Sequence, residues 1–214
     1  MSQKTWLLVL VAGVLAFLAL LNAGGWRARI LARLLRTDNH PVVVPLPVDF
    51  RPTVPPGFKA SILTGGFEQP RWLGVAPNAD VFVADSAVGK IIVLHSPFAP
   101  GGPMRETFAD HLNLPFGIAF HGNYVYVATT NEVLRFRYDP RTAKRLGDAE
   151  HILGLPGFGY NQHWTRALAF RPDDTRLFVS VGSETNVSIE SDPRRAAVLV
   201  TDPEGKTCEF SRAD

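Results

Sequence analysis

Hydrophobic and polar positions alternate in the same way in three separate segments of the chain. The segments begin at Trp72, Phe116 and Ala167. Each opens with a short run of small and apolar residues, turns through polar residues, and continues into VFVAD, YVYVAT or LFVSV. Alternation with a period of two, rich in β-branched and aromatic residues and bounded by turn residues, is typical of half-buried strands. The pattern therefore predicts an all-β domain.

The three segments also form a repeat. Phe82, Tyr126 and Phe178 occupy matching positions that are 44 and then 52 residues apart. A unit of this length with about four antiparallel strands is typical of a β-propeller blade, whereas a sandwich would not repeat this order at this period. About three blades fit between Gly57 and the C-terminus, and a closed propeller needs at least four. We therefore expect a partial propeller over residues 57–214, which is a fragment, a truncated product or a half that needs a partner chain.

A different pattern precedes the strands. No residue from Thr5 to Trp26 is charged, and about 20 apolar residues in a helix span the hydrocarbon core of a bilayer. Trp6 and Trp26 stand at the two ends, where indole rings favour the membrane interface. The pattern predicts a transmembrane anchor over residues 6–26. A cleaved signal peptide is the alternative, although Leu21 stands where a small residue is wanted before the best cleavage site, at Ala23.

The residues after this span predict an interfacial helix and then a tether. Arg29, Arg33 and Arg36 fall on one face of a helix whose other face is apolar, so we expect the anchor region to cover residues 1–36. Residues 37–56 contain six prolines and predict an extended linker. The arginines after the span place the downstream side in the cytoplasm by the positive-inside rule.

Charge and cysteine content exclude several classes of function. Five of the 22 basic residues precede Asp38, the first acidic residue, so the rest of the chain is mildly acidic and predicts no nucleic-acid binding. Cys208 is the single cysteine, which rules out an intrachain disulfide or a multi-cysteine metal site. No metal site is expected from the other histidines, which show no ligand spacing and are interpreted as solvated: His40, His95, His111, His121 and His151.

Four stretches, in their order and spacing, resemble one known family. They are PPGF at 55–58, the segment 114–138, the segment 163–187 and RRAAVL at 194–199. Together they are similar to the glucose/sorbosone dehydrogenase family, whose members are six-bladed propellers that use pyrroloquinoline quinone (PQQ). The resemblance implies a PQQ-dependent sugar or alcohol dehydrogenase that passes electrons to an acceptor. It also implies about three four-stranded blades of an expected six, behind the transmembrane helix.

The resemblance assigns one residue a catalytic role. His163 matches the family's general base, which takes the hydroxyl proton of the substrate while hydride passes to the quinone. Imidazole suits this task because it accepts a proton near neutral pH. Without the resemblance, a histidine in a loop before a strand is more often a hydrogen-bonded surface group.

Neighbouring polar and aromatic residues are expected to lie next to substrate or cofactor. They are Gln162, Trp164, Arg166, Asn113 and Asn186. Other interpretations stay open: Arg166 could pair with Asp173 or Asp174 instead, and Trp164 could pack in the core.

The resemblance also brings expectations about what this chain lacks. The family's cofactor-binding basic residues and its calcium loop come from later blades, so we expect the 214-residue chain alone to bind PQQ weakly and to turn over little. The alternatives are a non-catalytic propeller module that binds a partner, and a propeller lactonase, for which the sequence offers no metal ligands. The family works outside the cytoplasmic membrane, so we expect the periplasmic side of a bacterial inner membrane, against the orientation that the arginines favour.

Overall fold

The strands of the domain form three antiparallel sheets of four strands each. The computed structural model describes residues 47, 50–157, 163–186 and 189–211. The first sheet holds β1 (Pro70–Val75), β2 (Val81–Asp85), β3 (Lys90–His95) and β4 (Met104–Ala109). The second holds β5 (Ile118–His121), β6 (Tyr124–Ala128), β7 (Glu132–Tyr138) and β8 (Arg145–Gly154). The third holds β9 (Leu168–Phe170), β10 (Leu177–Val181), β11 (Ala197–Thr201) and β12 (Cys208–Ser211).

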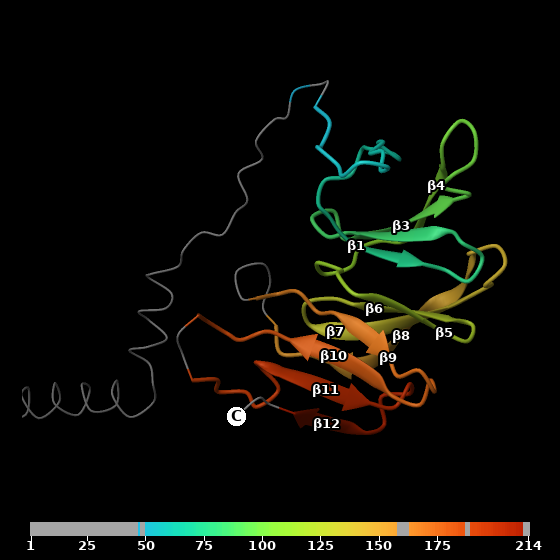
Figure 1. The fold of residues 1–214 in the computed structure, drawn as a ribbon. Helices are drawn as coiled ribbons and strands as arrows, with labels where there is room; N and C mark the ends of the chain where they lie inside the picture. Colours follow the sequence, from blue (N-terminus) through green and yellow to red (C-terminus); the bar gives the residue numbers. More distant parts are fainter. Residues whose placement is uncertain (1–46, 48–49, 158–162, 187–188, 212–214) are drawn as a thin grey trace, which may run out of the picture. The chain divides into compact units, whose positions relative to one another are not determined.

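The sheets follow one another with the same internal order. In each sheet, strands that follow one another in the chain pair as neighbours, from the first strand at one edge to the fourth at the other. The first strands of successive sheets contact each other, β1 with β5 and β5 with β9 (Figure 1). Repeated four-stranded sheets whose first strands meet along one line are the arrangement of propeller blades. The described residues thus form three blades of a partial propeller.

The apolar positions of the repeat are buried between the blades. Phe82 is completely buried between blades one and two, and it contacts Phe108, Phe120 and Tyr138 edge to face. Edge-to-face contacts between aromatic rings add to the stabilisation from burial. Tyr126 takes the equivalent place between blades two and three. The alternation that predicted the strands therefore also set the faces that join the blades.

One ion network ties the second blade to the third. Arg135 on β7 is bonded to Glu150 on β8 at 2.7 Å and to Glu204 at 2.9 Å. Glu204 lies in the turn between β11 and β12. Arg135 also donates to the Tyr126 hydroxyl and lies over the Tyr124 ring. Because the three acceptors come from both blades, this guanidinium fixes one blade on the other.

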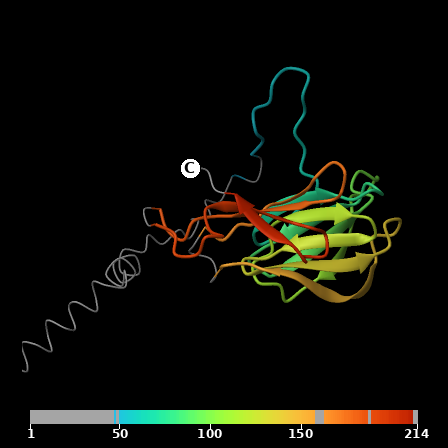
Figure 2. The same cartoon turned by 90° about the horizontal axis from the view of Figure 1, so that it is seen from below.

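The segment before the first blade contains no strand. Residues 50–69 are irregular, and much of this stretch stands clear of the sheets (Figure 2). Its end is fixed where the Asp85 carboxylate accepts hydrogen bonds from the amides of Glu68 and Gln69, at 3.0 and 2.6 Å. The chain therefore enters β1 from a defined point at the edge of β2.

The predicted anchor over residues 1–36 lies outside the described residues, as does most of the linker over 37–56. Within the described part of the chain, no helix is long and apolar enough to cross a membrane.

Candidate functional site

The segments that lead into β1, β5 and β9 meet at one end of the blades. Trp72 at the start of β1 lies 5.4 Å from Phe116, and Phe116 lies 5.8 Å from Trp164, measured between ring centroids. These three rings come from three different blades. The row of rings therefore brings together the entrances of the three inner strands, that is, the residues where β1, β5 and β9 begin. His163 is the residue before Trp164 and lies at the same place.

The backbone of His163 is held in an unusual conformation. Its φ is 41°, in the left-handed region that side chains with a Cβ rarely adopt. Gly182, just after β10, makes room for it, because a Cβ on this glycine would lie 2.6 Å from the Cβ of His163. A residue of any other type at position 182 would displace the histidine.

The imidazole ring of His163 is oriented by Ser183. Its Nδ1 lies 3.0 Å from the Ser183 carbonyl oxygen and 2.8 Å from the hydroxyl. A carbonyl oxygen can only accept, whereas the hydroxyl can also donate to an unprotonated Nδ1. In the tautomer with the proton on Nδ1, the carbonyl contact is a hydrogen bond and Nε2 keeps the free lone pair. The residue is exposed. The arrangement leaves Nε2 as the nitrogen that can take a proton from a bound molecule.

Arg166 lies behind the histidine and is completely buried. Its guanidinium donates to the carbonyl oxygens of His163 at 2.7 Å, Thr165 at 2.9 Å and Pro156 at 2.8 Å. Burial, with the neighbouring charge of Arg195, lowers the pKa of Arg166 to about 10. The side chain is thus a buried cation at neutral pH. The alternative pairing with Asp173 or Asp174 is not formed, because the ion pairs of these carboxylates are with Arg171 and His121.

The other predicted residues take different places. Trp164 is buried in the ring row, and Arg71 lies over its ring at 5.7 Å. Asn113 precedes β5, and its amide donates to the Asn131 side chain at 2.9 Å. Asn186 is exposed beyond β10. Gln162 lies outside the described residues.

Three residues of this region were missed by the sequence reasoning. Gly182 and Ser183 follow β10 and position His163. The sequence signal that could have found them is their place directly after LFVSV, the segment that matches VFVAD in the first repeat. Arg195 is buried beside Arg166, and one of its nitrogens lies 3.4 Å from the Ser183 carbonyl oxygen. Burial of two arginines carries no sequence signal, because arginine is usually exposed.

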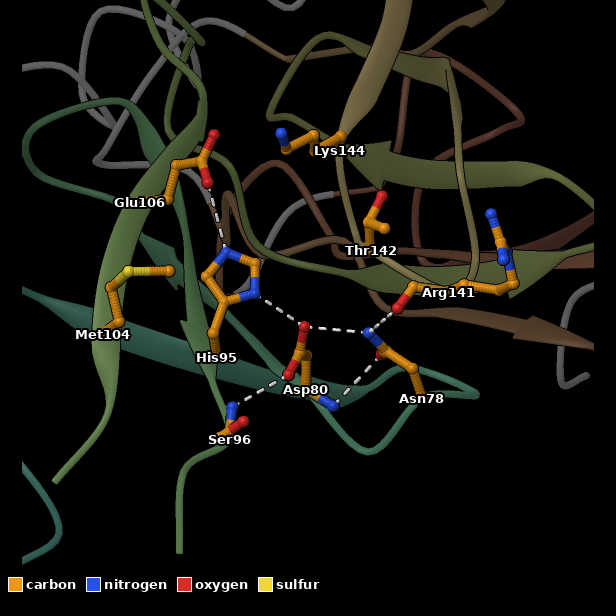
Figure 3. Close-up of a pocket in the computed structure, with 9 residues that line it drawn as sticks. All are labelled: Asn78, Asp80, His95, Ser96, Met104, Glu106, Arg141, Thr142 and Lys144. Atoms are coloured by element: carbon orange, nitrogen blue, oxygen red, sulfur yellow. Dashed lines mark hydrogen bonds and ion pairs between the residues drawn. The ribbon is translucent and has the colours of Figure 1, made fainter. Parts of the chain in front are cut away.

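A second polar cluster lies at the opposite ends of the strands, and it corrects the prediction for His95 (Figure 3). His95 is only 14 % exposed rather than solvated, with Nδ1 2.7 Å from Asp80 and Nε2 3.2 Å from Glu106. Lys144 and the Arg141 carbonyl, from the β7–β8 turn, border the same hollow of about 330 Å³. The polar groups of this cluster bond mainly to one another, so we interpret it as a structural link between blades one and two.

His121 is likewise not solvated, because its ring stacks on Phe170 at 4.7 Å and lies 3.7 Å from Asp174. His111 and His151 are exposed as expected, and His40 lies outside the described residues. Among the described residues, no three histidine, cysteine or acidic side chains are grouped so as to hold a metal ion.

Comparisons with known proteins identify the fold. One similar solved structure is the holo form of the pyranose dehydrogenase PQQ domain of Coprinopsis cinerea. It gives a TM-score of 0.64 and 18% identity over 75% of this chain and 41% of that chain. A family AA12 carbohydrate-active enzyme of Trichoderma reesei gives a TM-score of 0.59 at 20% identity, over 75% of this chain and 42% of that one. A putative oxidoreductase (glucose dehydrogenase) of Thermus thermophilus gives 0.51 at 22% identity, over 67% and 47%.

These likenesses establish the fold, and this chain spans less than half the length of each of the three. No curated protein matches the chain. The profile of one family, described as TrAA12-like, matches residues 52–200, which include all of β1 to β10, His163 and Arg166. The chain therefore belongs to the TrAA12-like family, which confirms the kinship inferred from the four sequence stretches.

Proposed function

We propose that this domain belongs to a PQQ-dependent dehydrogenase that oxidises an aldose or a sorbosone-type sugar, with His163 as general base. The observation that carries the proposal is the geometry of His163 within the family match. Ser183 holds the proton on Nδ1, and the exposed ring presents Nε2 beside the entrances of the three inner strands. A base positioned in this way contributes about 10²–10⁴ in rate.

The described residues fit an anionic cofactor in part. PQQ carries carboxylates and an ortho-quinone, and when bound it would supply the hydride acceptor. Arg71 is an exposed cation beside the ring row, whereas Arg166 and Arg195 are buried and contribute their positive potential. Arg71 is therefore the residue of this group that would contact a carboxylate of the cofactor. With a single exposed contact of this kind, the 214-residue chain alone is expected to bind PQQ weakly.

In the reaction, the residues of this chain bind, orient and move a proton. The ring row of Trp72, Phe116 and Trp164 places three aromatic rings side by side where the first strands of the blades begin. Nε2 of His163 takes the proton of the substrate hydroxyl, and the Ser183 carbonyl stabilises the imidazolium because it accepts from Nδ1. The electrons then leave to an acceptor.

The test compares the chain with His163→Gln, which keeps the size and polarity of the side chain but cannot act as base. PQQ binding is titrated first, and oxidation of aldoses with an electron-accepting dye is then expressed per bound PQQ. We expect unchanged PQQ affinity and a fall in rate of at least about 10²-fold. Equal rates in both proteins would contradict the role of His163. Because little turnover is expected of the 214-residue chain, oxidation is measured at saturating PQQ. Bound PQQ with no oxidation at all under that condition would favour the non-catalytic module.

We also propose that residues 6–26 anchor the protein in the membrane with the propeller domain on the periplasmic side. The uncharged stretch from Thr5 to Trp26 supports the anchor. Fractionation and a C-terminal reporter that is active on one side of the membrane test both parts. Recovery of the full chain in the soluble fraction would contradict the anchor, and a reporter active in the cytoplasm would contradict the orientation.

A further inference from the structure

Burial of the Arg166 side chain carries a high free-energy cost. Removing a guanidinium from water costs several kcal/mol unless its partners compensate. Among the residues that the structure describes, its three acceptors are all neutral carbonyl oxygens, and its Nε has no hydrogen-bond partner. A second buried arginine, Arg195, adds to the cost by repulsion. Stability by itself does not explain a cation here, since an apolar side chain of similar volume would fill the space at lower cost.

The three contacts of Arg166 instead define one geometry of the chain. One guanidinium holds the carbonyl oxygens of Pro156 and His163, which lie seven positions apart. The backbone of Arg166 is fixed from the other side, because its own carbonyl accepts from the amide of Gly117 at 3.0 Å. A Cβ on Gly117 would collide with this carbonyl. The backbone of Arg166 is thus bonded to Gly117 of the second blade, while its guanidinium binds carbonyl oxygens of the segment that leads into the third blade.

His163 needs such an external constraint. A residue with a Cβ in the left-handed region carries about 1–2 kcal/mol of strain, so an unconstrained His163 would leave this conformation. Ser183 holds only the ring. The Arg166 guanidinium holds the His163 carbonyl at 2.7 Å and thereby restricts the backbone torsions.

We propose that Arg166 is a positioning residue for His163. Through the carbonyl oxygens of His163, Thr165 and Pro156, it keeps the histidine in the left-handed conformation that places Nδ1 on Ser183 and presents Nε2. Its guanidinium acts through the histidine and does not touch substrate. This role rests on the proposed function only in assigning catalysis to Nε2. The restraint on the ring is a property of the folded chain and is measurable without turnover.

The test observes the ring directly. The full chain is labelled with ¹⁵N-histidine, His163 is assigned from the signal that His163→Gln removes, and its nitrogen shifts report which nitrogen carries the proton. Arg166→Met removes all the carbonyl contacts but keeps much of the volume. The control is Arg171→Met, since Arg171 is an exposed arginine just after β9. We expect the native chain and the control to show the proton on Nδ1, and Arg166→Met to change the ratio of the two tautomers by about threefold or more.

A second readout tests the catalytic consequence. A displacement of about 1 Å in a catalytic group costs up to about 10²-fold in rate. Arg166→Met is therefore expected to lower the rate per bound PQQ, measured at saturating PQQ, by about 10- to 100-fold. If Arg166→Met does not fold, Arg166→Lys takes its place, because it keeps the charge but presents one nitrogen where arginine presents two.

The outcomes separate this inference from the proposed function. Native His163 signals in a folded Arg166→Met, or in a folded Arg166→Lys if that variant is needed, would overturn the positioning role. Altered signals together with undiminished oxidation in His163→Gln would retain the positioning role and refute the proposed function.

Discussion

Gly182→Ala is the change that tests the His163 geometry most simply. The added Cβ would lie 2.6 Å from the Cβ of His163 and 2.9 Å from its carbonyl oxygen. Optimal separation between carbon atoms is about 3.5–4.0 Å, so relief requires a shift of about 1 Å. Both contacted atoms belong to the backbone or to Cβ, so no flexible side chain can move aside. Overpacking of this kind costs about 1–3 kcal/mol.

Urea unfolding measures this cost. With a loss of about 2 kcal/mol and a slope of about 2 kcal/mol/M, the midpoint should fall by about 1 M. The same displacement should lower oxidation per bound PQQ by up to about 10²-fold. Gly147→Ala is the matched control, because a Cβ at Gly147 in β8 meets no atom within 4 Å. A Gly182→Ala protein with the native midpoint and native His163 signals would refute the close approach.

Three further predictions concern charge. Arg135→Ala should lower the free energy of unfolding, measured by urea titration, by about 2 kcal/mol, because it removes the ion network between the blades. The loss stays moderate because the acceptors left behind are half-exposed and water solvates them. Arg137 is an exposed arginine on the same strand, so the control Arg137→Ala should change this free energy little. Burial tends to raise the pKa of Asp202, but hydrogen bonds from the Thr207 hydroxyl and nearby amides outweigh it and lower this pKa to about 2. The carboxylate therefore stabilises the fold above its unfolded pKa of about 3.9, and this stabilisation is lost as pH falls through about 2. Asp202→Asn should lower the melting temperature at neutral pH but not below pH 2. A lower melting temperature that persists below pH 2 would contradict this. Arg71→Gln should weaken PQQ binding about fivefold in a fluorescence titration that Arg137→Gln leaves unchanged, and equal affinities would exclude Arg71 as a cofactor contact.

The sequence predicted the parts of the fold that repeat. Phe82, Tyr126 and Phe178 all lie on the second strand of a blade, as their spacing indicated. The outer strands were harder to find, because their residues do not alternate between core and solvent. The first seven residues of β8 are all exposed, so this strand shows almost no alternation of apolar and polar residues.

The predicted site lacked the residues that surround and orient His163. The stretch around His163 could be singled out because it matches a family motif. The contacts that orient it could not, since Ser183 is 20 positions away and Pro156 belongs to the preceding blade. The buried state of Arg166 also runs against the usual exposure of arginine. The burial of His95 also escaped prediction, because its partners Asp80 and Glu106 come together only when β3 pairs with both β2 and β4.

The pH dependence of sugar oxidation tests the central claim, that the inner strand entrances present a histidine as base. The rate per bound PQQ is measured from acid to alkaline pH in the native chain and in His163→Gln. We predict a native rate that rises with the loss of one proton and then levels off, and a variant rate that is lower and lacks this rise. Superimposable profiles in the two proteins would contradict the account.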